Sequence, residues 1–413
     1  METAINKRRL FNACSLALVV TALTFAIRAN LMGPLGEAFG LTPKAIGEIA
    51  SAAFWGFTAA MLIGGLLCDV IGLGKMYILA FVGHVAGIIL TIYATGYWSL
   101  FVSTLFVGLG NGFVESASYA MVSSMYTTDK IRKINAWHIW FPAGIVIGGV
   151  LAYLLTLLDL GWKIQMVVML PPTIVYGAMF LKQQFPRSER VSMGVSNREM
   201  IRECLRPLFI FMLFCMFLTA ATELGTNQWI VELLSAVGVP SILLLVFING
   251  IMTVGRANAG FILQRLSPVG LLLFSAIFSF IGLYWLGSAQ GYVTFAAAGV
   301  FAIGICFFWP TMIGFVSEKL PKTGPLGLSL MGGAGLLSTA LVLPYFGQLY
   351  DHQLTFIAAT DNRLLPEQVK LAAGARTLLF ISAIPAVLIV AFGMLKIRSL
   401  KKVSSLKISS LKK

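Results

Sequence analysis

The stretch 11–33, FNACSLALVVTALTFAIRANLMG, carries a single charged residue, Arg28. A helix rises about 1.5 Å per residue, so about 20 apolar residues cross a hydrocarbon layer of about 30 Å. The stretch is therefore predicted to be a membrane-spanning helix. Its length and its lack of a small-residue cleavage site argue against a removable signal peptide.

The rest of the chain repeats this pattern. Of 413 residues, 58% are hydrophobic and 11% are charged, about half the charge density of a soluble domain. This composition excludes a soluble fold. We expect an all-α membrane protein with twelve transmembrane helices, at 11–33, 46–68, 76–95, 99–126, 134–157, 163–184, 207–234, 240–264, 269–288, 292–317, 326–350 and 376–396.

The most polar internal segment, QQFPRSERVSMGVSNREMIRECLR, separates the sixth span from the seventh. We therefore expect a first six-helix bundle at 1–184, a cytoplasmic linker at 185–206, a second bundle at 207–398 and a basic cytoplasmic tail at 399–413. The long segment between the eleventh and twelfth spans is expected to be an external loop with a short helix after Pro366.

The net charge of +14 reflects basic residues in short loops, with no continuous patch for nucleic acid. Most Lys and Arg residues fall on the side of the amino terminus, which predicts that both termini are cytoplasmic. We expect an integral, multi-pass protein of the plasma (inner) membrane whose partners are the lipid bilayer and a small-molecule substrate.

Ionisable groups inside spans cost about 2.5 to 3.5 kcal/mol and normally face a bundle interior. Glu115 lies mid-span, and Asn111 and Ser118 share its helix face. This stripe suits a sugar hydroxyl array, and Glu115 suits proton coupling. The alternative is a structural carboxylate paired with Arg28, Arg256 or His138.

His138 belongs to the next, antiparallel span and is expected to face Glu115 in the inner half of the bundle. A His near a Glu is a plausible proton relay. The alternative role is a hydrogen-bonded packing residue.

The seventh span contains TELGTNQW, in which Glu223 and Asn227 share a face and Gln228 lies beside them. Gly225 weakens the helix there, and broken helices are common where a transporter exposes backbone to its ligand. Trp229 would supply an apolar plate for a sugar ring. A substrate or ion role competes with an outer gate or interhelical hydrogen bonding.

Two arginines also occur within predicted spans. Arg256, in the eighth span, would bind an anionic substrate group, pair with Glu223 or Glu115, or reach the inner surface along its own apolar stem. Arg28, with Asn30 two residues on, would reach the outer interface or line the cavity mouth.

The tenth span contains FFWPT, where Pro310 removes a backbone bond and bends the helix. Trp309 beside this kink suits a moving gate and a wall against which a sugar stacks.

The segment GGLLCDVIGLGK, between the second and third spans, resembles the loop signature of the major facilitator superfamily. The residues that match are Gly65, Leu67, Asp69, Gly72 and Lys75. The resemblance implies two pseudo-symmetric six-helix bundles. It also implies a gating role for Asp69 and Lys75, since an acid at an inner helix end can cap helix amino termini of the other half in one conformation only.

GLGNGFVESASYAMV, NAWHIWFPAG, TELGTNQWIVELL and FFWPTMIGF are similar to segments of the fucose permease and sodium-glucose group of that superfamily. This narrower resemblance implies a monosaccharide or related polyol as substrate. The acid that the group carries in its first helix has no counterpart here, where Arg28 and Asn30 stand.

Together these features predict a secondary active transporter that carries a small polar solute, a sugar above all, by symport with H⁺ or Na⁺. No GxxxxGK[ST] loop is present, so an ion or solute gradient must supply the energy.

Only three His residues occur, far apart, so we expect no metal site, no cofactor and no enzyme. Arg28 and Arg256 are gating candidates in addition to Asp69 and Lys75. The alternatives are an organic-anion symporter, in which either arginine binds a carboxylate, and a drug-proton antiporter. A monomer is expected.

Overall fold

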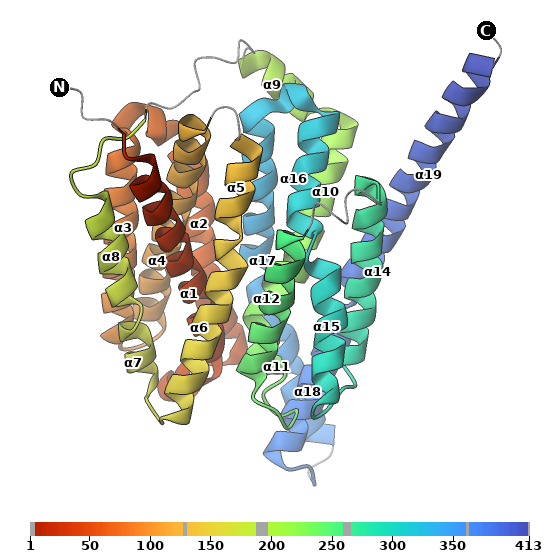
Figure 1. Ribbon diagram of the computed structural model, residues 1–413. Helices are drawn as coiled ribbons and strands as arrows, with labels where there is room; N and C mark the ends of the chain where they lie inside the picture. The colour runs from red at the N-terminus through yellow and green to blue at the C-terminus, as the bar shows by residue number, and fades with distance from the viewer. Residues whose placement is uncertain (1–4, 127–129, 187–196, 259–265, 361–362, 412–413) are drawn as a thin grey trace.

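The computed structural model describes residues 5–126, 130–186, 197–258, 266–360 and 363–411, and every regular element in these ranges is helical. The helices form two groups side by side (Figure 1). The first group contains α1 (Lys7–Phe39), α2 (Pro43–Ile71), α3 (Leu73–Ile92), α4 (Tyr97–Met125), α5 (Lys130–His138), α6 (Trp140–Leu157), α7 (Trp162–Val167) and α8 (Leu170–Phe180). After α9 (Asn197–Cys204), the second group contains α10 (Pro207–Ala220), the π-helical turn η2 (Ala221–Gly225), α11 (Thr226–Leu233), α12 (Ser241–Ala257), α14 (Pro268–Leu286), α15 (Val293–Ile305), α16 (Phe308–Lys319), η3 (Pro321–Thr323), α17 (Gly324–Thr360), α18 (Pro366–Ile381) and α19 (Ala383–Leu411).

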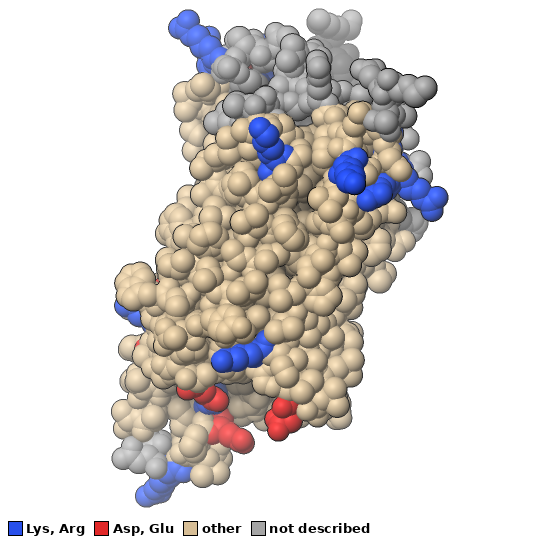
Figure 2. All heavy atoms as spheres, turned by 90° about the vertical axis from the view of Figure 1, so that its left-hand side faces the viewer, with Lys and Arg blue, Asp and Glu red and all other residues tan. Residues whose placement is uncertain are grey.

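The predicted membrane spans are present. Within the described residues, 11 helical stretches are long and apolar enough to cross a membrane, and α12 is a shorter apolar helix of 17 residues. Together they account for the twelve predicted spans. Figure 2 shows the result at the surface, where a broad belt without charged side chains separates the charged ends of the molecule.

The structure corrects the prediction around the last two spans. α17 continues to Thr360 and α18 begins at Pro366, so the segment predicted to be a long loop is mostly helical. The predicted helix start at Pro366 is correct. α19 runs on to Leu411, because the basic tail contains neither Gly nor Pro to end the helix.

Three spans are interrupted, and the sequence supplies a reason for each. Pro142 and Pro310 have no N–H, so the carbonyls of His138 and Cys306, four residues earlier, lose their helical partners. α5 ends at His138, and α15 ends just before Cys306. The seventh span widens into the π-helical turn Ala221–Gly225, which contains Glu223 and ends at Gly225, the glycine that the sequence predicts to weaken this helix.

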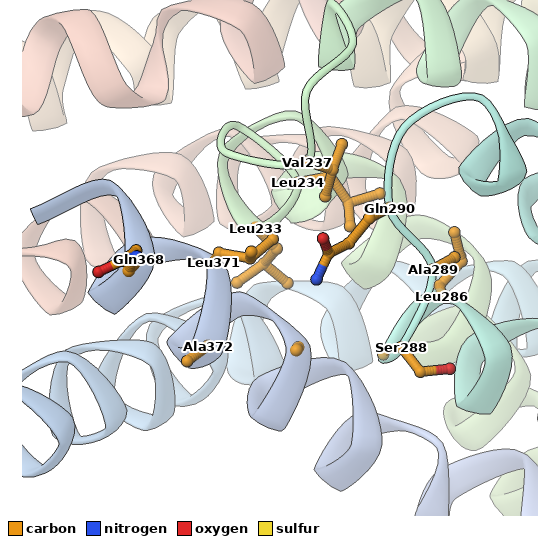
Figure 3. A pocket seen from close by; sticks show the side chains of 12 residues that line it. Leu233, Leu234, Val237, Leu286, Ser288, Ala289, Gln290, Gln368, Leu371 and Ala372 are labelled. Carbon is orange, nitrogen blue, oxygen red and sulfur yellow. The ribbon is translucent and has the colours of Figure 1, made fainter. Parts of the chain in front are cut away.

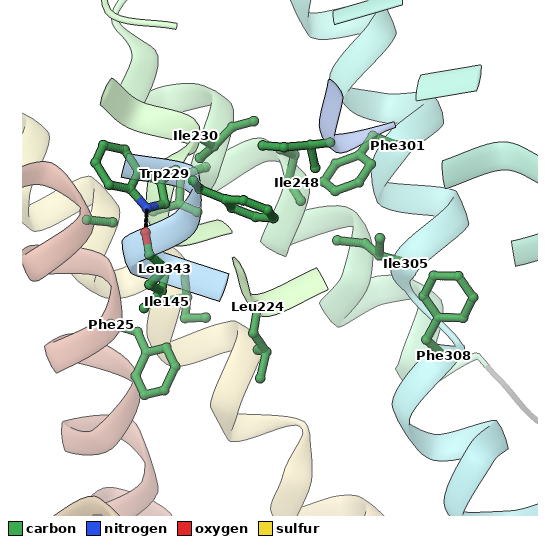
Figure 4. Packing of buried hydrophobic residues seen from close by; sticks show 14 of the residues in the cluster. Phe25, Ile145, Leu224, Trp229, Ile230, Ile248, Phe301, Ile305, Phe308 and Leu343 are labelled. Carbon is green, nitrogen blue, oxygen red and sulfur yellow. Dashed lines mark hydrogen bonds between the residues drawn. The ribbon is translucent and has the colours of Figure 1, made fainter. Parts of the chain in front are cut away.

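The two groups meet closely where small residues allow backbones to approach. α2 packs along α17, where a Cβ at Gly47 would lie 2.6 Å from the carbonyl oxygen of Leu343 and one at Gly347 would overlap the Pro43 carbonyl. Within the second group, Trp229 Nε1 donates to the Leu343 carbonyl at 3.1 Å and joins α11 to α17 (Figure 4). These contacts hold the interface closed toward one end of the molecule.

Both chain termini and α9 lie at the opposite end, the upper end in Figure 1. On the face that Figure 2 shows, Asp and Glu gather at the lower end, whereas Lys and Arg occur at both. The close backbone contacts between α2 and α17 therefore lie toward the end opposite the termini.

Candidate functional site

The first group of helices contributes a buried acid, a histidine and a tyrosine. Glu115 on α4 is 6% exposed, and its Oε1 lies 3.7 Å from Nε2 of His138 at the end of α5. The Tyr119 hydroxyl hydrogen-bonds both to Glu115 and to His138 Nε2. Because a hydroxyl has one hydrogen, Tyr119 can donate to the carboxylate while accepting from a protonated Nε2. The facing arrangement of Glu115 and His138 predicted from the sequence is therefore present, with Tyr119 between them.

The second group contributes an ion pair. Arg256, near the end of α12, donates from Nη2 to Glu223 Oε1 at 2.7 Å, and the two side chains are 14% and 5% exposed. Its Nε donates to the Cys306 carbonyl at 3.0 Å, the carbonyl that Pro310 leaves without a helical partner. The interpretation that Arg256 reaches the inner surface is wrong, because its guanidinium is held inside the bundle by these two bonds.

The two sets of side chains lie within electrostatic reach of each other across the interface. Arg256 is close enough for its charge to act on both Tyr119 and His138. The arginine therefore lies between an acid of its own half, Glu223, and the polar triad of the other half. We call Glu115, Tyr119, His138, Glu223 and Arg256 the central charged layer.

Such a layer is costly unless its members are paired. Each charge buried in a span costs about 2.5 to 3.5 kcal/mol on insertion scales, and an unpaired buried charge is a strong penalty in any protein interior. Movement of one proton or one anion into this layer changes which pairs are neutral. The layer can therefore link ligand or proton binding to the contact between the halves.

Arg28 forms a second cationic position. It is 9% exposed and donates from Nη2 to the Ala50 carbonyl at 2.9 Å. Within the described part of the chain, no carboxylate pairs with it. The interpretation that Arg28 reaches the outer interface is wrong, since it is buried between α1 and α2.

An aromatic cluster lies one turn before Arg28 on α1 and reaches the second half. Phe25, one turn before Arg28, packs edge-on against Phe54 at 5.2 Å and Phe141 at 5.1 Å between ring centroids. The Phe25 carbonyl accepts a hydrogen bond from Gln228 Nε2 of the second half at 3.4 Å. Figure 4 shows Phe25 in the packed region with residues of α11. Arg28 therefore shares a face of α1 with an aromatic cluster whose member Phe25 contacts the second half.

Several residues predicted to bind substrate are engaged elsewhere. Asn111 donates to Thr24 Oγ1 at 3.1 Å and contacts His84 Nε2 at 2.8 Å through Oδ1. Asn30 donates to Gln165 Oε1 at 3.0 Å within the first half. The structure does not bring these two amides into the central charged layer.

The predicted tryptophans differ in setting. Trp229 is fully buried inside the second half, so its ring is not a free plate. Trp309 is partly buried and packs over Gly335 and Gly332, close to Met61 of α2. Asn227 is buried, and its Oδ1 has no hydrogen-bond partner among the described residues.

Two gating candidates, Asp69 and Lys75, lie between the second and third predicted spans. The side chain of Asp69 lies outside the described part of the structure, and Lys75 is exposed in the first turn of α3. Sequence reasoning gave no role to Tyr119 or to His84, which joins Asn111 to the Tyr176 hydroxyl. The signal for Tyr119 was its position four residues after Glu115, on the same helix face.

Neither of the two cavities described is lined by a residue predicted for the site. One, of about 160 Å³, lies among the ends of α11, α14 and α18 and is mainly apolar (Figure 3). The other, of about 520 Å³, lies between α17 and α18. Among the described residues, no group of three or more His, Cys, Asp or Glu side chains could hold a metal ion.

The fold and the charged layer between two helix groups define an integral membrane transporter of the secondary type. Residues 14–343 match the family model of the Major Facilitator Superfamily, and the chain belongs to that superfamily. The resemblance read from GGLLCDVIGLGK is thereby confirmed. The narrower resemblance to the fucose permease group stays a prediction.

The chain is similar to known proteins over much of its length. It is 21% identical over 338 residues to the putative niacin/nicotinamide transporter NiaP of Bacillus subtilis (strain 168), covering 78% of this chain and 82% of that protein. It is 22% identical over 233 residues to the gentisate transporter of Corynebacterium glutamicum, covering 51% of this chain and 50% of that protein. A solved bacterial homolog of the human lysosomal transporter Spinster, inward-facing and unoccupied, superposes with a TM-score of 0.76 at 14% identity over 94% of this chain and 97% of that one.

Proposed function

We propose that this protein carries a small organic anion, an aromatic monocarboxylate, by alternating access coupled to protons. The observation that carries the proposal is Arg28, a buried cation with no carboxylate partner among the described residues, beside an aromatic cluster at the face between the halves. A planar guanidinium pairs with a carboxylate through two parallel hydrogen bonds. The ring of the substrate would then lie against Phe25 and its neighbours.

The names of the relatives support this substrate class in part. They refer to niacin/nicotinamide and to gentisate. Niacin and gentisate carry a carboxyl group on an aromatic ring, whereas nicotinamide carries a neutral amide there. A carboxylate bound at Arg28 offsets a buried charge that the protein itself leaves unpaired, so the loaded site is easier to enclose than the empty one.

The central charged layer would supply the coupling. In this proposal, a proton on Glu223 releases Arg256, which then pairs with Glu115 and Tyr119 across the interface. Deprotonation returns Arg256 to Glu223, with which it pairs at 2.7 Å in this structure. The coupling groups are thus Glu115, His138 and Glu223, and Arg256 makes the contact that differs between conformations.

A monosaccharide, the substrate that the fucose permease resemblance implies, competes with this proposal. Asn111 and Trp229, two residues expected to bind a sugar, already have partners within their own halves. This geometry favours the organic anion. A drug-proton antiporter would instead be blocked by lipophilic cations, so competition with sugars, carboxylates and such cations separates the three classes.

The proposal includes topology. The side of the termini, α9 and most basic loop residues is placed in the cytoplasm, and the closed contacts between α2 and α17 face outward. The transporter is proposed to work as a monomer in the plasma (inner) membrane, with residues 1–184 and 207–398 as its two moving halves.

The test uses purified protein in vesicles with an imposed inward proton gradient. We expect uptake of radiolabelled nicotinate or benzoate, collapse of that uptake by a protonophore, and competition by aromatic carboxylates. Arg28→Gln should lower uptake at least about 10-fold, since a charge-assisted pair contributes about 1.5 to 3 kcal/mol. Arg28→Lys should keep part of it.

Arg9→Gln is the matched control, because Arg9 also donates to a backbone carbonyl, that of Met179 at 2.9 Å, but is exposed near the chain terminus. It should leave uptake unchanged. Full carboxylate uptake by Arg28→Gln, or uptake blocked by sugars and not by carboxylates, would remove the proposed substrate class.

A further inference from the structure

A groove between α17 and α18 lies apart from the central charged layer. Its volume is about 520 Å³, and it is lined by His352, Gln353, Phe356, Arg376, Leu379 and Phe380. The lining is half cationic or polar and half apolar, and it contains no acidic side chain. Nothing in the transport proposal uses this groove.

The cationic part of the groove is organised around one ring. The Arg376 guanidinium lies 5.7 Å from the centroid of the Phe356 ring. The His352 ring stacks nearly parallel to the same ring, at 6.3 Å between centroids and 10° between planes. No carboxylate pairs with Arg376 in the described ranges. Two nitrogen-bearing groups are thus held around one aromatic ring with their donors free for an anion.

The apolar part of the groove is open to the outside. Phe356 is 50% exposed, Phe380 is 58% exposed and Leu379 is 38% exposed. Exposed apolar side chains on a membrane-spanning helix face lipid, so an acyl chain can lie along them. A free inorganic anion would leave this surface unused, whereas an acyl chain would cover it.

The position of the groove along the span identifies the partner as lipid. The apolar stretch of the eleventh span ends near residue 350 and that of the twelfth begins near 376, so His352 and Arg376 lie where hydrocarbon gives way to headgroups. Exposed aromatics at other helix ends on this side, Tyr93, Trp98 and Tyr292, mark the same interfacial level.

We propose that this groove binds an anionic phospholipid, with the phosphate on Arg376 and His352 and an acyl chain along Phe356 and Phe380. The phosphate accepts charge-assisted hydrogen bonds from the guanidinium, and the acyl chain of the lipid covers the exposed apolar side chains. The site would hold α17 to α18 at the end where the halves are closed.

The test measures lipid binding to the delipidated, full-length protein in neutral detergent, by native mass spectrometry and by thermal unfolding. Phosphatidylglycerol should bind and raise the melting temperature more than phosphatidylcholine. Arg376→Gln should weaken phosphatidylglycerol binding about 10-fold, as expected for loss of a charge-assisted bond. Phe380→Ala should also weaken it, without changing any charge.

Lys163→Gln is the matched control, because Lys163 is also a cation over an aromatic ring, 5.5 Å from the Trp162 centroid, but lies in the first half. It should retain the preference for phosphatidylglycerol. An unchanged preference in Arg376→Gln overturns the proposal. Displacement of the lipid by inorganic phosphate, together with no effect of Phe380→Ala, would identify a free-anion site and overturn the lipid assignment. None of these readouts depends on which solute is transported.

Discussion

At the scale of single residues, Arg256 has the most consequential set of contacts. It satisfies Glu223 and the Cys306 carbonyl in its own half and lies near Tyr119 and His138 of the other. A residue with this set of neighbours can exchange partners without losing all of its hydrogen bonds. The free energy of the layer therefore depends on the pair and not on either member alone.

This pairing predicts a non-additive response to substitution. Arg256→Gln leaves Glu223 as an uncompensated buried charge, and we expect it to destabilise the protein by about 3 to 5 kcal/mol. The double variant with Glu223→Gln should recover much of that loss, because the remaining buried groups are neutral. Thermal unfolding of the four proteins in the same detergent measures the coupling. Simple addition of the two single effects would show that the pair does not interact.

At the scale of elements, the interruptions in three spans connect sequence to the site. Pro310 leaves the Cys306 carbonyl without a helical partner, and Arg256 takes that position at 3.0 Å. Pro142 ends α5 at His138 by the same mechanism. The π-helical turn holds Glu223. Each interruption thus lies at a member of the central charged layer or at a group bonded to one. A regular helix would use the Cys306 carbonyl for its own hydrogen bond and leave none for Arg256.

We predict that Pro310→Ala slows transport while the protein stays folded. The alanine N–H would compete with Arg256 for the Cys306 carbonyl and straighten the tenth span, so the melting temperature should be unchanged or raised while the initial uptake rate falls several-fold. Pro268→Ala is the control, since Pro268 lies in the first turn of α14 and removes no helical bond. Equal transport by the two variants would contradict the role given to the tenth span.

At the scale of the whole molecule, the contact between α2 and α17 determines which end is closed. Gly47 and Gly347 bring the two backbones together, and the Trp229 indole supports α17 from inside the second half. Contacts this close have no room for a side chain. The closed end should therefore open if either glycine gains a bulky group.

We expect Gly47→Leu to separate the halves at this end and shift the population toward the opposite conformation. A cysteine introduced at Asn227 should then react at least several-fold faster with a membrane-impermeant maleimide added outside intact cells. Gly250→Leu is the control, because a Cβ there meets nothing within 4 Å. The assignment of the closed end to the outside fails if Gly47→Leu leaves the labelling rate unchanged or if labelling requires permeabilised cells.

The sequence by itself determined the class of protein and the twelve spans, because a hydrocarbon solvent forces long apolar helices whatever their neighbours. It also indicated the kink at Pro310 and the proximity of Glu115 to His138, which depend on local chemistry and on antiparallel neighbours. Only the tertiary structure decided that Arg256 pairs with Glu223, that Arg28 is buried without a carboxylate, and that Asn111 and Trp229 have partners inside their own halves. Those outcomes depend on how far helices rotate and approach one another, and the 3.6-residue repeat of a chain buried on nearly all sides does not encode that rotation.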